Sequence, residues 1–221
     1  MKRQAVLVTR PEPGLTGTLE DVRRLGWSAI ACPMLDVRAY APIAVRECVA
    51  VAITSANALV ALQDWPRDQR IVAVGSSTAA RARDMGFQWV EAADGDARSL
   101  AAYCHSHNLT GPSLLLACGE GYGLDLAEEL NASRVSVYGV TKNVRLTDAA
   151  REALLRHEAE AVVFYSGKTA DAFLEALEEQ DRKSLSGVRA LCLSEAIAAR
   201  LTEKDWRAVE WPDPLERLGP Y

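Results

Sequence analysis

Short apolar runs alternate along the chain with segments in which apolar residues recur at helical spacing. The runs are continuous, as is typical of parallel strands covered on both faces, and the alternation predicts a doubly wound α/β fold. The predicted strands are Ala5–Thr9, Ala50–Thr54, Ile71–Val74, Ser113–Ala117, Arg134–Tyr138, Ala161–Tyr165 and Ala190–Leu193. The predicted helices are Thr18–Leu25, Ala58–Gln63, Thr78–Met85, Ala97–Cys104, Leu124–Leu130, Thr147–Glu158, Lys168–Gln180 and Glu195–Glu203, with stops expected at Gly26, Gly86 and Asn131.

An internal repeat divides the chain into two related halves. Three segments of the first half align in order with three of the second: Ala5–Leu25 with Ser113–Leu130, Val51–Leu62 with Val162–Leu174, and Arg70–Phe87 with Arg189–Trp206. The middle pair aligns on Ser55 and Ser166, each of which follows an apolar run. Two related halves predict two similar lobes, and a cleft between lobes is a common place for a ligand.

Two segments of mixed polarity, Pro33–Pro42 and Gly139–Leu146, are expected to connect the lobes as extended chain. The C-terminal tail Trp211–Tyr221 contains three prolines. We expect this tail to be loose or to lie along the surface.

Composition narrows the class of protein. The chain has 221 residues, 49% of them hydrophobic, and a net charge of −5, so it can build packed cores and lacks the basic footprint of a nucleic-acid partner. No apolar stretch approaches the roughly 18–20 residues that span a bilayer, and no signal segment stands out. The 5 cysteines have no paired spacing, which favours reduced thiols and a cytoplasmic protein.

Small or hydroxyl-bearing residues follow most of the repeated strands. They are Thr9, Ser55, Ser76-Ser77-Thr78, Cys118-Gly119 and Ser166-Gly167. A serine or threonine there can cap the following helix, whose first N–H groups and dipole attract anions. Each cap could also be purely structural, and the pattern alone leaves that alternative open.

Several familiar motifs are incomplete. Gly167-Lys168-Thr169 resembles the end of a phosphate loop, but Val162 stands where the first glycine of that loop is needed. A dinucleotide fingerprint is suggested by Gly119, Gly121 and Gly123, but its third glycine is missing. Cys104, His105 and His107 lack a second ligand cluster for a metal, and G-x-S-x-G is absent.

The polar candidates for chemistry are Tyr138, Lys168, Arg10 and Tyr165, which stand near strand ends. Tyr138 is expected to end its strand, with its hydroxyl at the mouth of the cleft. The alternative is an aromatic residue at the edge of the core whose hydroxyl has a partner.

Six motifs, in this order and spacing, resemble the uroporphyrinogen-III synthase family. They are L-V-T-R-P at Leu7–Pro11, I-T-S-A-N-A at Ile53–Ala58, A-V-G-S-S-T-A at Ala73–Ala79, L-L-L-A-C-G at Leu114–Gly119, V-S-V-Y at Val135–Tyr138 and V-F-Y-S-G-K-T-A at Val163–Ala170. The resemblance implies an α/β protein with two similar doubly wound parallel-sheet lobes joined by a two-segment linker. Lobe one would hold residues 1–37 and 144–221, and lobe two residues 38–143.

The resemblance also implies a reaction. The family cyclises hydroxymethylbilane, with inversion of the last pyrrole ring, to uroporphyrinogen III in tetrapyrrole (heme) biosynthesis. It needs no metal or cofactor, so the expected protein is a monomeric cyclising lyase whose partners are this substrate and, as a candidate, the preceding pathway enzyme. Since the uncatalysed reaction closes the ring without inversion, the enzyme's task is mainly to impose geometry.

Residue by residue, Tyr138 matches the tyrosine that assists departure of the substrate hydroxyl. Ser55, Thr78 and Ser166 match turn residues that line the family's cleft, and Arg10 matches a strand-end arginine that binds substrate or makes a structural pair. The complete expected set of substrate-binding residues is Arg10, Ser55, Ala56, Ser77, Thr78, Cys118, Gly119, Ser166, Gly167 and Lys168.

Two turns depart from the family pattern. Ser194–Ala198 places Glu195 and Ile197 where the family commonly shows a hydroxyl, and Cys118–Gly123 lacks an arginine and paired glycines. Lys168 replaces a small residue and could supply the missing charge. These departures keep open a second hypothesis, a non-catalytic two-lobed binding protein for an anionic or tetrapyrrole ligand.

Overall fold

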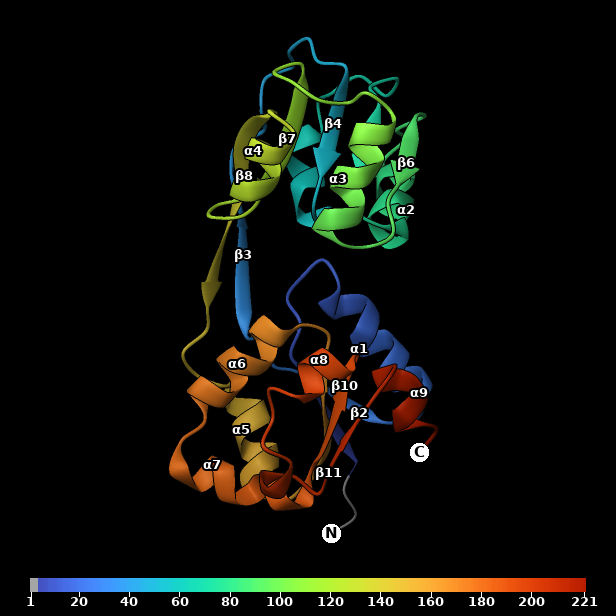
Figure 1. The fold of residues 1–221 in the computed structure, drawn as a ribbon. Coiled ribbons are helices and arrows are strands. Elements are labelled where there is room, and N and C mark those ends of the chain that lie inside the picture. The colour runs from blue at the N-terminus through green and yellow to red at the C-terminus, as the bar shows by residue number, and fades with distance from the viewer. Residues whose placement is uncertain (1–3) are drawn as a thin grey trace. The chain divides into compact units, whose positions relative to one another are not determined.

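The computed structural model describes residues 4–221, which form two compact units (Figure 1). Unit 1 contains the described residues up to Asp36 together with Thr141–Tyr221, and unit 2 is Val37–Val140. The chain leaves unit 1 along strand β3 (Leu35–Ala39) and returns along β8 (Ser133–Lys142). Both expected connectors are therefore extended in the part that these strands cover.

Unit 1 is built on a five-stranded sheet in the order β11-β10-β9-β1-β2. Its strands are β1 (Ala5–Val8), β2 (Ser28–Ala31), β9 (Ala159–Phe164), β10 (Arg189–Cys192) and β11 (Ala208–Glu210), and each neighbouring pair is parallel. Its helices are α1 (Leu15–Arg24), α5 (Asp148–Leu155), α6 (Gly167–Ala176), α7 (Glu179–Ser184), α8 (Glu195–Ala198) and α9 (Pro214–Leu218), with the short 3₁₀ turns η2 (Leu185–Gly187) and η3 (Glu203–Asp205).

Unit 2 is built on a six-stranded sheet in the order β3-β8-β7-β4-β5-β6. Besides β3 and β8 it contains β4 (Ala50–Ile53), β5 (Ile71–Ala73), β6 (Val90–Ala92) and β7 (Leu114–Gly119), and the strands from β8 to β6 pair in parallel. Its helices are η1 (Ala56–Leu62), α2 (Ser76–Asp84), α3 (Ala97–Ser106) and α4 (Leu124–Glu129). The predicted α/β fold with parallel sheets is confirmed.

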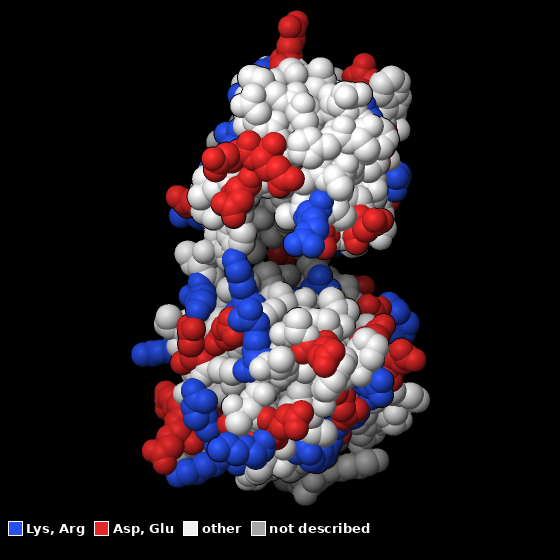
Figure 2. All heavy atoms as spheres, in the orientation of Figure 1, with Lys and Arg blue, Asp and Glu red and all other residues white. Residues whose placement is uncertain are grey.

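Charged side chains are spread differently over the two units. Figure 2 shows basic and acidic atoms interspersed over the visible face of unit 1. On the visible face of unit 2, acidic atoms gather over α4, which carries Asp125, Glu128 and Glu129. Helix α4 therefore presents acidic side chains to solvent, whereas its Leu126 is buried.

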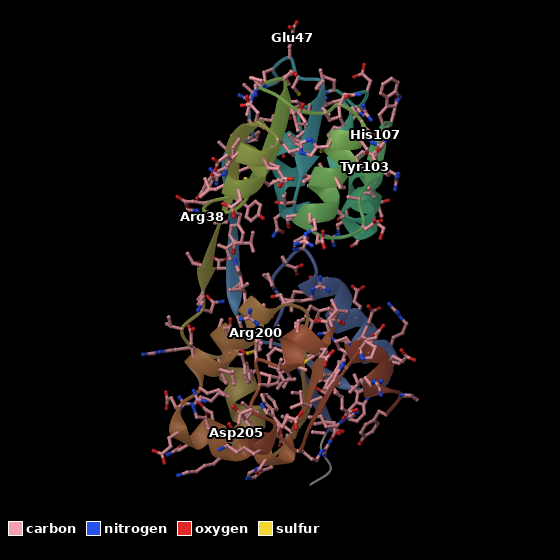
Figure 3. All side chains as sticks on the ribbon, viewed as in Figure 1. Arg38, Glu47, Tyr103, His107, Arg200 and Asp205 are labelled. Carbon is pink, nitrogen blue, oxygen red and sulfur yellow. The ribbon has the colours of Figure 1, made fainter. Side chains whose placement is uncertain are left out.

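The helix stops lie where the sequence predicts them. Gly26, Gly86 and Asn131 follow α1, α2 and α4 with φ of 91°, 93° and 50°, in the left-handed region that ends a helix. Helix α3 ends in the same way, at Asn108 with φ of 54°, and its last turn also carries an aromatic pair: the rings of Tyr103 and His107 stack with centroids 4.0 Å apart (Figure 3).

Three predicted helices differ from those observed. Lys168–Gln180 is not one helix, because α6 ends at Ala176 and α7 begins anew at Glu179, where the Asp181 carboxylate accepts from the Glu178 amide at 3.0 Å. Glu195–Glu203 forms only the single turn α8 before η3. Ala58–Gln63 is replaced by the 3₁₀ helix η1.

Of the two expectations for the C-terminal tail, the structure shows the one in which it lies along the surface, and the tail is not loose. Leu218 of α9 is buried, and the Trp27 indole donates to the Gly219 carbonyl at 2.8 Å. The Tyr221 ring meets the Trp27 ring edge-on at 4.8 Å, and its amide donates to the Leu25 carbonyl. These contacts fasten the tail to the region that follows α1.

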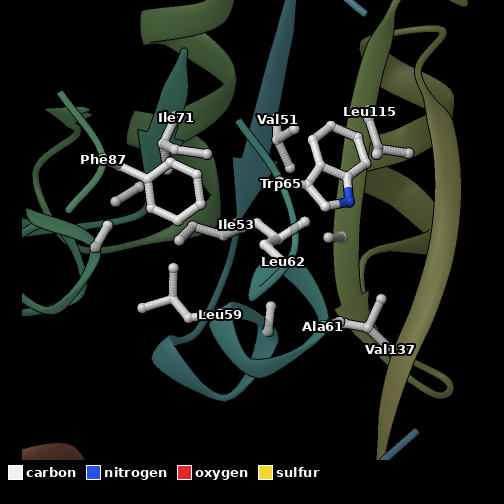
Figure 4. Close-up of a cluster of buried hydrophobic side chains, with 14 of the residues drawn as sticks. Val51, Ile53, Leu59, Ala61, Leu62, Trp65, Ile71, Phe87, Leu115 and Val137 are labelled. Atoms are coloured by element: carbon white, nitrogen blue, oxygen red, sulfur yellow. The ribbon is translucent and has the colours of Figure 1, made fainter. Parts of the chain in front are cut away.

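The core of unit 2 occupies both faces of its sheet. On one face Val51, Ile53, Ile71 and Phe87 surround the residues of η1 (Figure 4), and a second cluster fills the other face between the sheet and α3 and α4. The Trp65 indole in the first cluster donates to the Ile43 carbonyl at 2.9 Å, so its polar group has a partner. A sheet covered on both faces explains why its strands read as continuous apolar runs.

Candidate active site

The carboxyl edge of the unit 2 sheet collects most of the predicted site residues. Tyr138 lies on β8, Cys118 and Gly119 end β7, Ser55 follows β4, and Ser77 stands in the first turn of the helix that follows β5. Because β8, β7, β4 and β5 are neighbours in that order, these positions form a row along one edge. Open parallel sheets bind ligands at this edge.

The Tyr138 side chain extends from β8 over the neighbouring strand β7 to Ser55, which follows β4. A side chain at Gly119 of β7 would have its Cβ only 2.7 and 2.8 Å from two carbons of the Tyr138 ring, so the ring occupies the space that the glycine leaves open. The phenol hydrogen-bonds with the side chain of Ser55, which follows β4. Gly119 therefore lets Tyr138 lie over β7.

The expected strand end at Tyr138 is wrong, since β8 continues to Lys142. The side chain is only 5% exposed, packs at the edge of the unit 2 core and has its hydroxyl beside the Ser55 side chain. Burial raises the pKa of the Tyr138 phenol, and hydrogen bonds from Ser55 and the Gly119 backbone oppose that rise in part. The phenol therefore stays protonated at neutral pH and keeps a proton to donate.

Ser55 is a helix cap, as predicted. Its hydroxyl accepts from the Asn57 amide at 3.2 Å, and Ala56 begins η1 directly behind it. The same side chain contacts the Tyr138 phenol, so the start of η1 fixes the partner of that phenol.

The helix after β5 starts without a side-chain cap. Gly75 is the N-cap of α2, Thr78 is buried, and Ser77 is exposed in the first turn. A Cβ at Gly75 would lie 3.0 Å from the Gly95 Cα, so close backbone approach selects glycine there. The predicted capping role of this serine–threonine cluster is wrong, because the cap position comes one residue before the cluster.

Cys118 does not cap a helix either. Its buried thiol donates to the Tyr122 carbonyl at 3.2 Å, and burial raises its pKa, which keeps it an unreactive thiol. The N-cap of α4 is Gly123, in the left-handed region with φ of 69°. The last two residues of β7 together with the segment that leads to α4, residues 118–123, are called the site loop below.

Sequence reasoning missed two residues that hold the site loop. Arg134 of β8 donates to two of its carbonyls, and the Tyr40 hydroxyl donates to the Glu120 carboxylate. Tyr40 follows β3, so its position beside residue 120 depends on the pairing of β3 with β8. The sequence signal for Arg134 was a charged residue near the start of a strand in which Val135, Val137 and Val140 recur.

In unit 1, the Arg10 side chain contacts other residues of the same unit. Its guanidinium carbon is 4.4 Å from the centre of the Tyr165 ring, and Nη1 donates to the Thr18 hydroxyl at 3.4 Å. Thr9 is fully buried and donates to the Val163 carbonyl at 2.7 Å, so it joins β1 to β9 rather than capping α1.

Ser166 caps α6, as predicted. Its hydroxyl accepts from the Thr169 amide at 3.2 Å, and the exposed Lys168 belongs to the first turn. A Cβ at Gly167 would lie 2.4 Å from Nε of Arg200, whose guanidinium is paired with Asp171 of α6 (Figure 3). The start of α6 thus carries a capped turn with two basic side chains close to it in sequence or in space.

The corresponding turn after β10 is different. Ser194 is the N-cap of α8 but makes no side-chain cap hydrogen bond, and Glu195 places an acid in the first turn. Ile197, which stands where the resemblance led us to expect a hydroxyl, is buried. The helix spans only Glu195–Ala198, so it offers less of a dipole than α6.

Within residues 4–221 we find no group of three or more His, Cys, Asp or Glu arranged as metal ligands. Across the same residues, no helix is both long and apolar enough to cross a membrane.

Comparison with known proteins decides the family. A protein-family model described as uroporphyrinogen-III synthase HemD matches residues 18–214. The chain belongs to this family. No curated protein matches it with significance.

Solved uroporphyrinogen-III synthases share the fold. The uroporphyrinogen-III synthetase from Helicobacter pylori aligns with a TM-score of 0.62 and 19% identity over 97% of this chain and 95% of that chain. A mutant uroporphyrinogen III synthase from Thermus thermophilus aligns with a TM-score of 0.55 and 17% identity over the same shares of the two chains. At these identities the likeness establishes the fold, while the family match carries the assignment as a cyclising lyase.

Proposed function

We propose that this chain cyclises hydroxymethylbilane to uroporphyrinogen III with Tyr138 as the residue that assists loss of the substrate hydroxyl. The observation that carries the proposal is the Tyr138 phenol, lying over Gly119 and hydrogen-bonded to Ser55 at the carboxyl edge of the unit 2 sheet. It is a protonated donor at a ligand-binding edge in a member of this enzyme family.

The chemistry needs a donor. Breaking the carbon–oxygen bond places negative charge on the leaving oxygen, and a phenol that donates a hydrogen bond to it stabilises the transition state. The raised pKa of Tyr138 keeps the phenol neutral far above neutral pH. The contact with Ser55 limits rotation of the phenol hydroxyl. Less rotational freedom is therefore lost when the substrate binds.

The substrate carries carboxylates, and these need hydrogen-bond donors of their own. In unit 1 we assign this role to the capped start of α6, with Ser166, Gly167 and Lys168, and to Arg10. In unit 2 we assign it to the first turns after β4 and β5, which contain Ala56, Ser77 and Thr78. Basic and acidic atoms are interspersed on the visible face of unit 1, so local donors rather than one broad basic field would bind the carboxylates there (Figure 2).

Incubation with freshly prepared hydroxymethylbilane, followed by oxidation and separation of the porphyrin isomers, tests the proposed function. The expected product is mainly the type III isomer, formed faster than the ring closes unaided. Only the type I isomer, at the uncatalysed rate, would refute the proposal. Tight binding of the substrate without conversion would instead support the binding-protein hypothesis.

The proposal also covers the architecture, location, oligomeric state and partner of the enzyme. We assign the two units to the two lobes of the family architecture, and we expect a cytoplasmic monomer that works without metal or cofactor. Since its substrate closes spontaneously, direct supply by the preceding pathway enzyme would protect it. Sedimentation at micromolar concentration tests the monomer, and co-sedimentation with the preceding enzyme tests the partner.

A further inference from the structure

The site loop is tied to β8 by one arginine side chain. Nε of Arg134 donates to the Tyr122 carbonyl at 2.8 Å, and Nη2 donates to the Gly119 carbonyl at 3.3 Å. The two acceptors lie three residues apart in the loop, at its start and near its end. A guanidinium holds its donors in a rigid planar fork, so a single side chain can bridge two carbonyls in this way.

The same loop forms the surface on which Tyr138 rests. The Tyr138 ring lies over Gly119, and the Tyr122 ring comes within 3.1 Å of the point where a Cβ at Gly119 would stand. The Glu120 amide donates to the Tyr138 carbonyl at 2.8 Å. Movement of the loop would therefore change how deep the Tyr138 ring lies and where its hydroxyl points.

Two other side chains make weaker contacts with the loop. The Cys118 thiol donates to the Tyr122 carbonyl, and the exposed Tyr40 hydroxyl donates to the Glu120 carboxylate. A thiol is a weak donor, and an exposed pair of this kind adds little stability. Among the loop contacts described here, the half-buried Arg134 is the one that links both ends of the loop to the strand that carries Tyr138.

We infer that Arg134 is a positioning residue, which sets the Tyr138 hydroxyl by clamping the site loop beneath its ring. The inference rests on the proposed role of Tyr138 for its effect on catalysis. Its effect on the environment of the phenol follows from the fold alone.

A double-mutant cycle tests the catalytic part. Arg134→Met should lower kcat by roughly fivefold, the equivalent of about one net hydrogen bond, with a smaller change in KM. In a Tyr138→Phe background the same substitution should have almost no effect on kcat, because there is no hydroxyl left to position. Equal losses in both backgrounds, or no loss in either, would overturn the inference.

Arg83→Met is the matched control. Arg83 also lies in unit 2 and donates to a carbonyl, that of Val90 at 2.7 Å, but it contacts β6 rather than the site loop. It should destabilise the fold to a similar degree and leave kcat unchanged. Arg134→Lys keeps the charge but loses the fork, so it should fall between wild type and Arg134→Met and serves as the test if the methionine variant does not fold.

A titration separates this inference from the proposed function. Ultraviolet titration of each protein, minus the matching Tyr138→Phe protein, gives the pKa of the Tyr138 phenol without any turnover. Arg134→Met should bring that pKa down toward the ordinary tyrosine value of about 10, since a loosened loop admits water, and Arg83→Met should not. An unchanged pKa in Arg134→Met would refute the positioning role even in a protein that makes uroporphyrinogen III, and the expected shift would support it in one that does not.

Discussion

Arg70 and Glu91 form a two-point ion pair, with Nε to Oε2 at 2.6 Å and Nη2 to Oε1 at 3.0 Å. Arg189 and Glu210 repeat it in the other unit, at 2.8 and 3.0 Å. Each pair joins the start of one strand to the outermost strand beside it, β5 to β6 and β10 to β11. The internal repeat of the sequence is thus visible in a side-chain contact as well as in the backbone.

These pairs should stabilise each unit. Arg189→Met removes the partner of a Glu210 side chain that is only 29% exposed, and also a contact with Glu160. We expect a loss of about 1–2 kcal/mol in the free energy of unfolding, because a half-buried carboxylate is left without its charge partner. Urea unfolding measures the loss. The control is Arg156→Met, whose exposed pair with Glu152 should be worth less than about 0.5 kcal/mol.

Acid should weaken the same contacts. The hydrogen bond from Arg189 holds the pKa of Glu210 below its ordinary value, and Arg70 does the same for Glu91. A carboxylate with a lowered folded-state pKa contributes stability above its unfolded pKa, and this stability is lost as pH falls through the folded pKa. Melting temperature should therefore drop as pH falls below about 4, the ordinary glutamate range. A Glu91→Gln, Glu210→Gln protein should show a shallower drop, and an identical slope would contradict the assignment.

Gly119→Ala should impair the enzyme by moving Tyr138. The new methyl group would lie 2.7 Å from a ring carbon, so the ring must shift away from Ser55. We expect kcat to fall roughly tenfold or more, in keeping with the loss of one positioned donor. The control is Gly17→Ala in α1, where no atom lies within 4 Å of the added Cβ and alanine favours the helix. Activity of Gly119→Ala equal to that of the control would show that the ring does not need this space.

Lys168→Ala tests the carboxylate role proposed for the start of α6. Lys168 is exposed in the first turn of a helix capped by Ser166. If it binds ground and transition states alike, KM should rise about three- to tenfold with kcat nearly unchanged. Lys183→Ala in α7, which breaks an exposed pair with Glu179, is the control and should leave both constants as they are. Unchanged kinetics for Lys168→Ala would make this lysine a solvated one.

The sequence predicted those features that short segments determine. The parallel sheets follow from continuous apolar runs, and the Ser55 and Ser166 caps follow from a hydroxyl between a strand and a helix. The stops at Gly26, Gly86 and Asn131 follow from residues that tolerate positive φ.

Other features depend on residues that are distant in sequence. In the sequence, Gly119 suggests an anion-binding turn. In the structure, the Tyr138 ring lies over this glycine. Arg134 donates to two backbone carbonyls, which residue identity does not reveal. Strand β6 has only three residues, too few for a hydrophobic period to show, and it is defined by its pairing with β5.

Tyr138→Phe is the direct test of the chemistry. It keeps the ring that packs over Gly119 and removes only the hydroxyl that would donate to the leaving oxygen. We expect kcat to fall roughly ten- to a hundredfold, at or below the low end for acid–base groups, because the substrate already ionises unaided. The product should remain the type III isomer, since the fold still holds the substrate in the folded geometry.

Tyr103→Phe is the matched control for that test. The Tyr103 phenol interacts with Glu91 and Arg70, and its ring stacks on His107, away from the row of site residues. Loss of this hydroxyl should leave kcat unchanged.

Activity of Tyr138→Phe should also stay low at every pH up to about 10, the ordinary tyrosine pKa. The wild type, whose phenol has a raised pKa, should hold its activity beyond that point. Full activity in Tyr138→Phe would remove the phenol from the mechanism and leave catalysis to backbone donors and confinement of the substrate.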